Sequence, residues 1–128
     1  MKYYISKKIQ TEFEEAVQLI TNALKVEGFG VLSEIDIQEK LNEKLGVDFR
    51  KYRILGACNP PYAFKALQQE DKIGTMLPCN VVVQQLDDNT VEVAAVDPIA
   101  SMVAVDNMQL VDIAKEIRAK LERAIAAL

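Results

Sequence analysis

The stretch VVVQQLDDNTVEVAAV, residues 81–96, decides which architecture this chain adopts. Three consecutive valines make its first half β-prone, residues 87–89 (Asp-Asp-Asn) supply turn chemistry, and a second alternating run follows from Val91. We therefore expect two antiparallel strands joined as a hairpin, which Asp97 and Pro98 bring to an end. A doubly wound parallel sheet needs a helix between each pair of strands, so this hairpin argues against it.

Upstream of the hairpin, alternating runs predict three more strands. They lie at residues 3–8, 29–37 and 52–58. Between the first two, apolar residues recur every three or four positions over residues 13–24, which predicts a helix of about four turns. Thr11 and Glu14 have the spacing of a capping box for its start, and Gly28 can take the left-handed conformation that ends it.

Two short helices are expected beside these strands. Asp36 caps the first, which ends at Gly46 and should cover one end of the sheet. The second is predicted at residues 62–69, where Asn59 can act as the cap and Pro60 can occupy the first helical position.

The C-terminal segment predicts one long helix, whose start is marked by Asp106 and Gln109. Its apolar residues recur at alternating intervals of four and three, in a stripe formed by Leu110, Ala114, Ile117, Leu121, Ala124 and Leu128. The element order β-α-β(4)-α favours an α+β fold of two layers, an antiparallel sheet with both long helices on one face. No repeat or linker divides the sequence, so we expect a single domain over residues 1–128.

Composition excludes several classes of protein. Half of the residues are apolar and 27% are charged, which is typical of a globular chain, and no apolar window approaches the ~20 residues of a membrane span. The alternating N-terminus differs from the continuous apolar core of a signal peptide, so we expect a soluble, cytoplasmic protein. Fifteen basic and nineteen acidic residues give a net charge of −4. Because the cations are also scattered, neither nucleic acid nor a membrane is an expected partner.

The chain contains no histidine, which removes Ser-His-Asp and Cys-His catalysis and the zinc sites that use histidine. It also lacks the glycine-rich loops that hold phosphates at helix N-termini. No pattern therefore names a substrate or a cofactor: the cofactor is unknown, and whether the protein is an enzyme stays open at this level.

Two similar segments carry the remaining chemistry, GACNPP at residues 56–61 and LPCNV at residues 77–81. Cys58 lies where a strand leads into a helix whose free amides can stabilise a thiolate, and Cys79 follows Pro78 at an irregular strand start. The alternative is that both cysteines pack as small hydrophobes. If their strands are neighbours, the sulfurs could form a reversible disulfide or half of a metal site. Closed zinc sites need four ligands, so no metal ligand is assigned.

We expect a small cleft near these cysteines. Its predicted lining is Cys58, Asn59, Tyr62, Cys79 and Asn80. Charged residues that could surround it with anion-binding or acid–base groups are Arg53, Lys65, Asp71, Lys72 and Asp97. The alternative for these charges is a solvated rim.

The run PIASMVAV, residues 98–105, is too apolar for a loop that lies fully in water. It either tucks under the final helix or joins the apolar stripe of residues 110–128 in a homodimer contact. Both alternatives predict that something covers it.

Three segments are distinctive together: residues 56–60 (GACNP), 73–83 (IGTMLPCNVVV) and 96–98 (VDP). On these segments the chain resembles the bacterial and archaeal domain of unknown function family 302, over nearly its whole length. The resemblance implies a β-α-β(4)-α topology similar to one half of the TATA-box-binding protein saddle, and assembly as a homodimer. It is not extended to DNA binding, because the acidic balance lacks the cations that phosphates require. Cys79 and Cys58 fall where the family's motif lies, which assigns them no reaction.

Two hypotheses of function follow. The first is a homodimeric module that binds a small molecule or a partner in the cleft near Cys58 and Cys79. The alternative is a thiol-dependent enzyme or redox sensor, in which Cys79 reacts and Cys58 is the resolving thiol. A third class, metal binding across a dimer, would require zinc held by Cys79.

Overall fold

The structure is a computed structural model and describes residues 2–128. In chain order its elements are β1 (Tyr4–Ile9), α1 (Phe13–Val26), β2 (Gly30–Asp36), α2 (Ile37–Leu45), β3 (Tyr52–Cys58), α3 (Pro60–Gln69), the 3₁₀ helix η1 (Asp71–Met76), β4 (Cys79–Gln85), β5 (Val91–Val96), α4 (Pro98–Ser101) and α5 (Met108–Ala126). Every predicted strand and helix has a counterpart, and η1 and α4 are additional.

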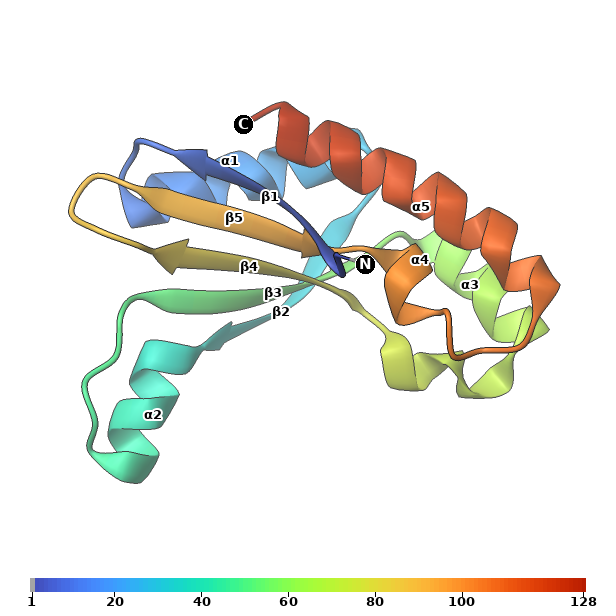
Figure 1. The fold of residues 1–128 in the computed structure, drawn as a ribbon, viewed down its shortest axis with the longest axis horizontal. Helices are drawn as coiled ribbons and strands as arrows, with labels where there is room; N and C mark the ends of the chain where they lie inside the picture. The colour runs from blue at the N-terminus through green and yellow to red at the C-terminus, as the bar shows by residue number, and fades with distance from the viewer. Residues whose placement is uncertain (1) are drawn as a thin grey trace.

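The five strands form one sheet in the order β1-β5-β4-β3-β2, and all neighbouring strands are antiparallel (Figure 1). β4 and β5 form the predicted hairpin, in which Val81 lies opposite Ala95 and Val83 lies opposite Val93. The first strand of the chain pairs with β5 at one edge of the sheet, and β2 forms the other edge. The predicted antiparallel α+β architecture is confirmed.

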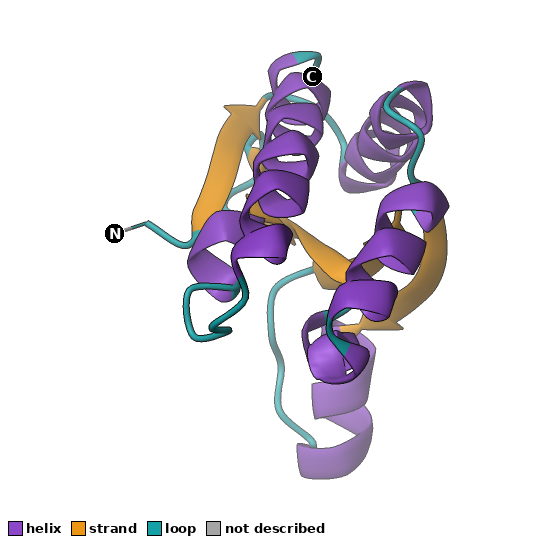
Figure 2. Ribbon diagram, turned by 90° about the vertical axis from the view of Figure 1, so that its right-hand side faces the viewer, coloured by secondary structure: helices purple, strands orange, loops and turns teal. Residues whose placement is uncertain are grey.

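The two long helices, α1 and α5, lie on the same side of the sheet and contact each other (Figure 1). The short helix α2 projects away from the sheet, on the other side from α1 and α5 (Figures 1 and 2). Its ends are as predicted, since Asp36 Oδ1 accepts the Glu39 amide at 3.0 Å and Gly46 has a φ of 66°. The expectation that it covers a sheet end is wrong. It contacts β3, but none of its residues is buried.

The ends of α1 show one wrong prediction and one confirmed one. Glu12, not Thr11, is the N-cap, so the helix starts one residue later than a capping box requires; the Thr11 hydroxyl instead donates to Glu15 Oε2 at 2.7 Å. At the C-terminus Gly28 has a φ of 90°, and the Phe29 amide donates to the Leu24 carbonyl at 2.9 Å. This is a Schellman motif, which turns the chain into β2.

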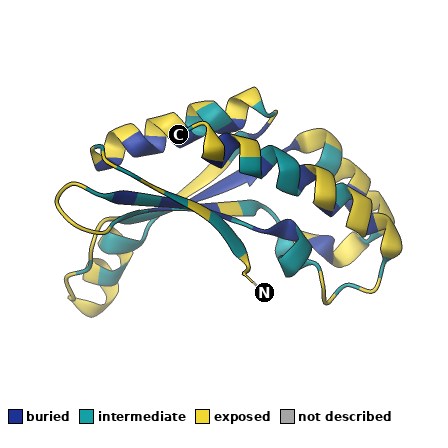
Figure 3. Cartoon of the chain, turned by 45° about the horizontal axis from the view of Figure 1, so that its top comes forward, coloured by how far each residue is buried: buried dark blue, intermediate teal, exposed yellow. Residues whose placement is uncertain are grey.

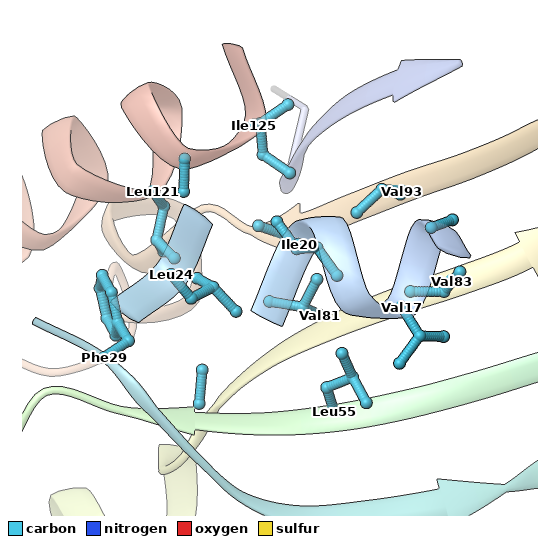
Figure 4. Close-up of a cluster of buried hydrophobic side chains, with 14 of the residues drawn as sticks. Val17, Ile20, Leu24, Phe29, Leu55, Val81, Val83, Val93, Leu121 and Ile125 are labelled. Atoms are coloured by element: carbon cyan, nitrogen blue, oxygen red, sulfur yellow. The ribbon is translucent and has the colours of Figure 1, made fainter. Parts of the chain in front are cut away.

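The main core lies between the sheet and the two long helices (Figures 3 and 4). The inward residues of β4 and β5 alternate as predicted, and Val81, Val83 and Val93 are fully buried. In α5 the predicted stripe is buried from Leu110 to Ala124, and Ile117, Leu121 and Ala124 of this stripe face the main core. Figure 4 shows Leu121 and Ile125 of α5 directed toward Ile20 and Leu24 of α1.

A smaller core lies under the far end of α5 and explains the apolar run of residues 98–105. Met102 and Val105 pack against buried Leu110, Ala66 and Ile73. Met102 and Val105 therefore tuck under the final helix, as the first alternative expected, whereas Val103 between them is 75% exposed. Most of the α5 stripe that the second alternative would use for a dimer contact is buried within the chain. Within residues 2–128, no helix has both the length and the apolar character needed to cross a membrane.

Candidate functional site

A cavity of about 290 Å³ lies at the end of the sheet where β3 stops and β4 begins. Helices α3 and α5, which contact each other beside this end of the sheet, provide much of its wall (Figure 1). Their contributions are small or aliphatic side chains: Ala63, Ala66 and Leu67 from α3, and Ile113, Ala114 and Ile117 from α5. The cavity is open to solvent on the side of Leu32, which is 71% exposed.

Both cysteines line this cavity. Cys58 is the last residue of β3 and Cys79 is the first of β4. In the β3–β4 register Ala57 is paired with Cys79, so Cys58 follows directly after that pair. Both residues are partly buried free thiols. The sequence left open whether these two strands are neighbours; they are, and residues 21 positions apart in sequence meet at one cavity.

The Cys79 thiol is held in its neutral form. Burial raises the pKa of Cys79 from 9.0 to about 11, and the nearby Cys58 adds a smaller repulsive contribution. A reactive cysteine needs the opposite, a pKa lowered by cations or helix amides. Within residues 2–128, no three side chains of Cys, Asp or Glu gather closely enough to hold a metal ion.

Asn59 and Tyr62 supply the other polar groups of the cavity wall. Asn59 is the N-cap residue of α3, but its side chain makes no capping bond, which corrects the expectation. Its Nδ2 donates instead to the Glu27 carbonyl at 3.1 Å, and so joins the end of α1 to the start of α3. Hydrogen bonding with the Glu116 carboxylate raises the pKa of Tyr62, with burial as the second cause.

Two residues predicted for the site, Asn80 and Asp97, lie elsewhere. Asn80 is on the uncovered face of the sheet, because alternation along β4 directs it away from Cys79 and Val81. Asp97 is a buried structural residue: its carboxylate accepts the Ile99 amide at 2.9 Å and pairs with Arg118 Nε at 2.9 Å. A carboxylate with both oxygens engaged in this way fixes α4 against α5.

The other charged candidates form surface pairs away from the cavity lining. Arg53 contacts Glu14 at 2.8 Å, and this hydrogen bond lowers the pKa of Glu14. Lys72 contacts Asp71 at 3.2 Å, and both side chains are exposed. Lys65 does not line the cavity, but its Nζ lies 5.3 Å from the centroid of the Tyr62 ring, at the cavity's rim. Of the five charges, Lys65 alone therefore lies beside the cavity, through Tyr62.

Comparison with known proteins gives the family. The family model described as "Domain of unknown function DUF302" matches residues 5–128. The chain belongs to the DUF302 family. Its structure is similar to the crystal structure of an uncharacterized conserved DUF302 protein from Bacillus stearothermophilus, at 30% sequence identity and a TM-score of 0.91, over 99% of this chain and 98% of that one. No curated protein matches the sequence.

In this DUF302 chain, sequence reasoning found the polar part of the cavity wall and missed its apolar part. The missed residues are Phe29, Leu32, Ala57, Ala63, Ala66, Leu67, Leu77, Pro78, Met102, Ile113, Ala114 and Ile117. A signal was present, since Ile117 and Ala114 lie in the predicted stripe of α5. An apolar stripe predicts core packing, however, and does not tell which of its residues face an empty volume.

Proposed function

We propose that this protein is a binding module for a small, largely apolar molecule, held in the cavity between α3, α5 and the ends of β3 and β4. The observation that carries the proposal is the wall of that cavity: it is almost entirely apolar, with Asn59, Tyr62 and the two thiols as its polar groups. Ligand sites have this composition, since apolar walls supply affinity and a few polar groups orient the ligand.

The size of the cavity limits the ligand. An apolar cavity of about 150 Å³ accepts benzene, so the 290 Å³ here, open to solvent on one side, suits a molecule of roughly 10 to 17 non-hydrogen atoms. Because the cavity opens to solvent beside exposed Leu32 and Leu67, such a ligand can enter without a large rearrangement.

The alternative function, a thiol-dependent enzyme or redox sensor, is less well supported by the site. Cys79 would have to lose a proton to react, and its pKa of about 11 opposes this at neutral pH. Within residues 2–128, no lysine or arginine lines the cavity to stabilise a thiolate. In the binding module, both cysteines serve as polarizable wall residues that contact an apolar ligand.

Filling the cavity should abolish most of the binding. Ala63 lines the cavity from α3 and is only partly buried, so Ala63→Phe places a benzyl group in the ligand's volume. We expect it to weaken binding of N-phenyl-1-naphthylamine roughly ten-fold, equivalent to losing about 60 Å² of apolar contact. Fluorescence titration of this uncharged probe, which brightens in apolar surroundings, measures the change.

The matched control is Ala126→Phe, an alanine-to-phenylalanine change at an exposed position of α5 outside the cavity lining. It should leave probe binding unchanged, and circular dichroism should show both variants folded. Equal probe binding by Ala63→Phe and the wild type would rule out this cavity as the binding site.

We also propose that the protein forms a homodimer through the uncovered face of its sheet. In a two-fold dimer both subunits contribute the same patch to the contact, so identical residues face each other near the axis. A patch with an uncharged centre avoids repulsion between identical charges there. Val82, Ala94 and Val96 form this centre and line a shallow hollow of about 380 Å³ together with three tyrosines and a polar border of Asn80, Gln84 and the charged Glu92. The support is this composition, together with the homodimer implied by the family resemblance.

The substitution Val82→Glu is expected to convert the dimer to a monomer, because two-fold symmetry brings two desolvated carboxylates together. Light scattering coupled to size-exclusion chromatography gives the mass of each variant. Val26→Glu, which places the same charge at a position 83% exposed on the helical side, should remain dimeric. A monomeric wild-type protein at high micromolar concentration would refute the dimer and leave the binding proposal intact.

A further inference from the structure

Two lysines from different helices meet beside Tyr62 at the rim of the cavity. Lys65 of α3 has its Nζ 5.3 Å from the centroid of the Tyr62 ring, and Lys120 of α5 has its Nζ 5.7 Å from the same centroid. Tyr62 itself lines the cavity. Two ammonium groups therefore lie around one aromatic side chain of the cavity wall.

Helix geometry explains why both lysines reach this place. Lys120 comes three residues after Ile117 and seven after Ile113, so it continues the face of α5 that lines the cavity. Lys65 comes three residues after Tyr62, and so lies next to it on the surface of α3. Both helices thus present an apolar wall and then, at its border, a cation.

The charge around this rim is not balanced by the protein. None of the ion pairs found within residues 2–128 involves Lys65 or Lys120. Glu116 interacts with Tyr62 and supplies one negative charge, against the two positive charges of the lysines. The lining of the cavity contains no charged residue. Two positive charges thus lie beside an apolar volume with one negative charge near them, and an anionic group at this rim would be attracted to both lysines.

We infer that the ligand of this cavity is an amphipathic anion, with its apolar body inside and its charged head at the rim beside Tyr62, within reach of Lys65 and Lys120. This inference rests on the proposed function, because it assigns the chemical class of the ligand for that same cavity. A cationic head would meet two like charges, and a neutral ligand would gain nothing from them. Fatty acids of medium chain length have the required form, a chain of apolar methylenes ended by one carboxylate.

Competition between octanoate and 1-octanol tests the inference. The two molecules have the same chain length and differ in the charge of the head group. Each should displace N-phenyl-1-naphthylamine from the wild-type protein. Octanoate should bind the wild-type protein roughly five-fold more tightly than it binds the double variant Lys65→Gln/Lys120→Gln. Binding of 1-octanol should be equal in the two proteins, and 0.5 M NaCl should weaken octanoate alone.

A control variant with the same change in net charge separates a local effect from a general one. Lys25 and Lys115 are exposed lysines that do not line the cavity or contact Tyr62, so Lys25→Gln/Lys115→Gln should bind octanoate like the wild type. Equal octanoate affinity in all three proteins, with 1-octanol still bound, overturns the inference and leaves the proposed function standing. If neither the probe nor either octyl compound binds, the proposed function fails and this inference fails with it.

Discussion

Iodoacetamide is expected to alkylate Cys79 about a hundred-fold more slowly than an ordinary thiol at pH 8, because only the thiolate reacts. Burial raises the pKa of Cys79 from 9.0 to about 11, and two pH units reduce the thiolate fraction by about a factor of one hundred. The variant Cys58→Ser leaves Cys79 as the single thiol, so mass spectrometry of the alkylated protein gives its rate directly. The rate should rise with pH toward a midpoint of about 11.

Two controls show whether the folded structure causes the slow reaction. In urea the same variant should react at the ordinary rate, since unfolding removes the burial. The variant Cys79→Ser reports Cys58 by itself. A folded-state midpoint below pH 8 for Cys79 would contradict the buried, neutral thiol and would favour the redox alternative over the binding module.

The same pKa predicts a dependence of stability on pH. Because Cys79 has a higher pKa in the folded state than in the unfolded state, the unfolded chain releases its proton first as pH rises. The contribution of Cys79 is therefore constant below pH 9 and decreases between pH 9 and about 11. Urea unfolding over this range should show a decline that Cys79→Ser reduces.

The sheet and its two long helices could be predicted because each is specified by a short-range pattern. The Val81 to Val96 segment contains both strands of the hairpin and its turn, and Gly28 ends α1 with the φ of 90° that a left-handed residue supplies. The α5 stripe is buried as its spacing predicts. In each case, local propensity and tertiary packing favour the same structure.

The predictions that were wrong depend on competition among polar groups. Asn59 has the right residue type and position to cap α3, yet its amide bonds to the Glu27 carbonyl, which the sequence places 32 residues away. Thr11 similarly bonds to Glu15 because the helix begins one residue later than expected. Which partner a short polar side chain selects is decided by the tertiary contacts around it.

The candidate site was predictable in its position and not in its extent. The matching segments at residues 56–61 and 77–81 drew attention to Cys58 and Cys79, and the register between neighbouring strands, which the sequence left open, brings them together. Asp97 was assigned to the site as one of the charged residues that could surround the cleft, but Arg118, which lies 21 residues later, pairs with it. An empty volume is a property of how α3 and α5 pack, and no local pattern encodes it.

Substitution of Gly56 by alanine is expected to lower the free energy of unfolding by about 1–3 kcal/mol, the usual cost of overpacking a filled site. A Cβ at Gly56 would lie 2.3 Å from Ser33 Oγ and 2.8 Å from Pro78 Cγ, both well inside van der Waals contact. Ser33 is exposed and can rotate, whereas the ring of Pro78 is fixed to the backbone beside Cys79. Because Pro78 lines the cavity, the same change should also weaken probe binding.

Two further variants identify the group that resists the new methyl. Gly30→Ala, in the neighbouring strand, meets no atom within 4 Å and should leave the free energy of unfolding within about 0.5 kcal/mol of the wild type. Adding Ser33→Ala to Gly56→Ala removes the oxygen contact and keeps the proline contact, so it should recover less than half of the lost stability in urea unfolding. Full recovery would assign the whole cost to Ser33, and Pro78 would then not need to move. The close packing of β3 against the segment before β4 would in that case not determine the shape of the cavity.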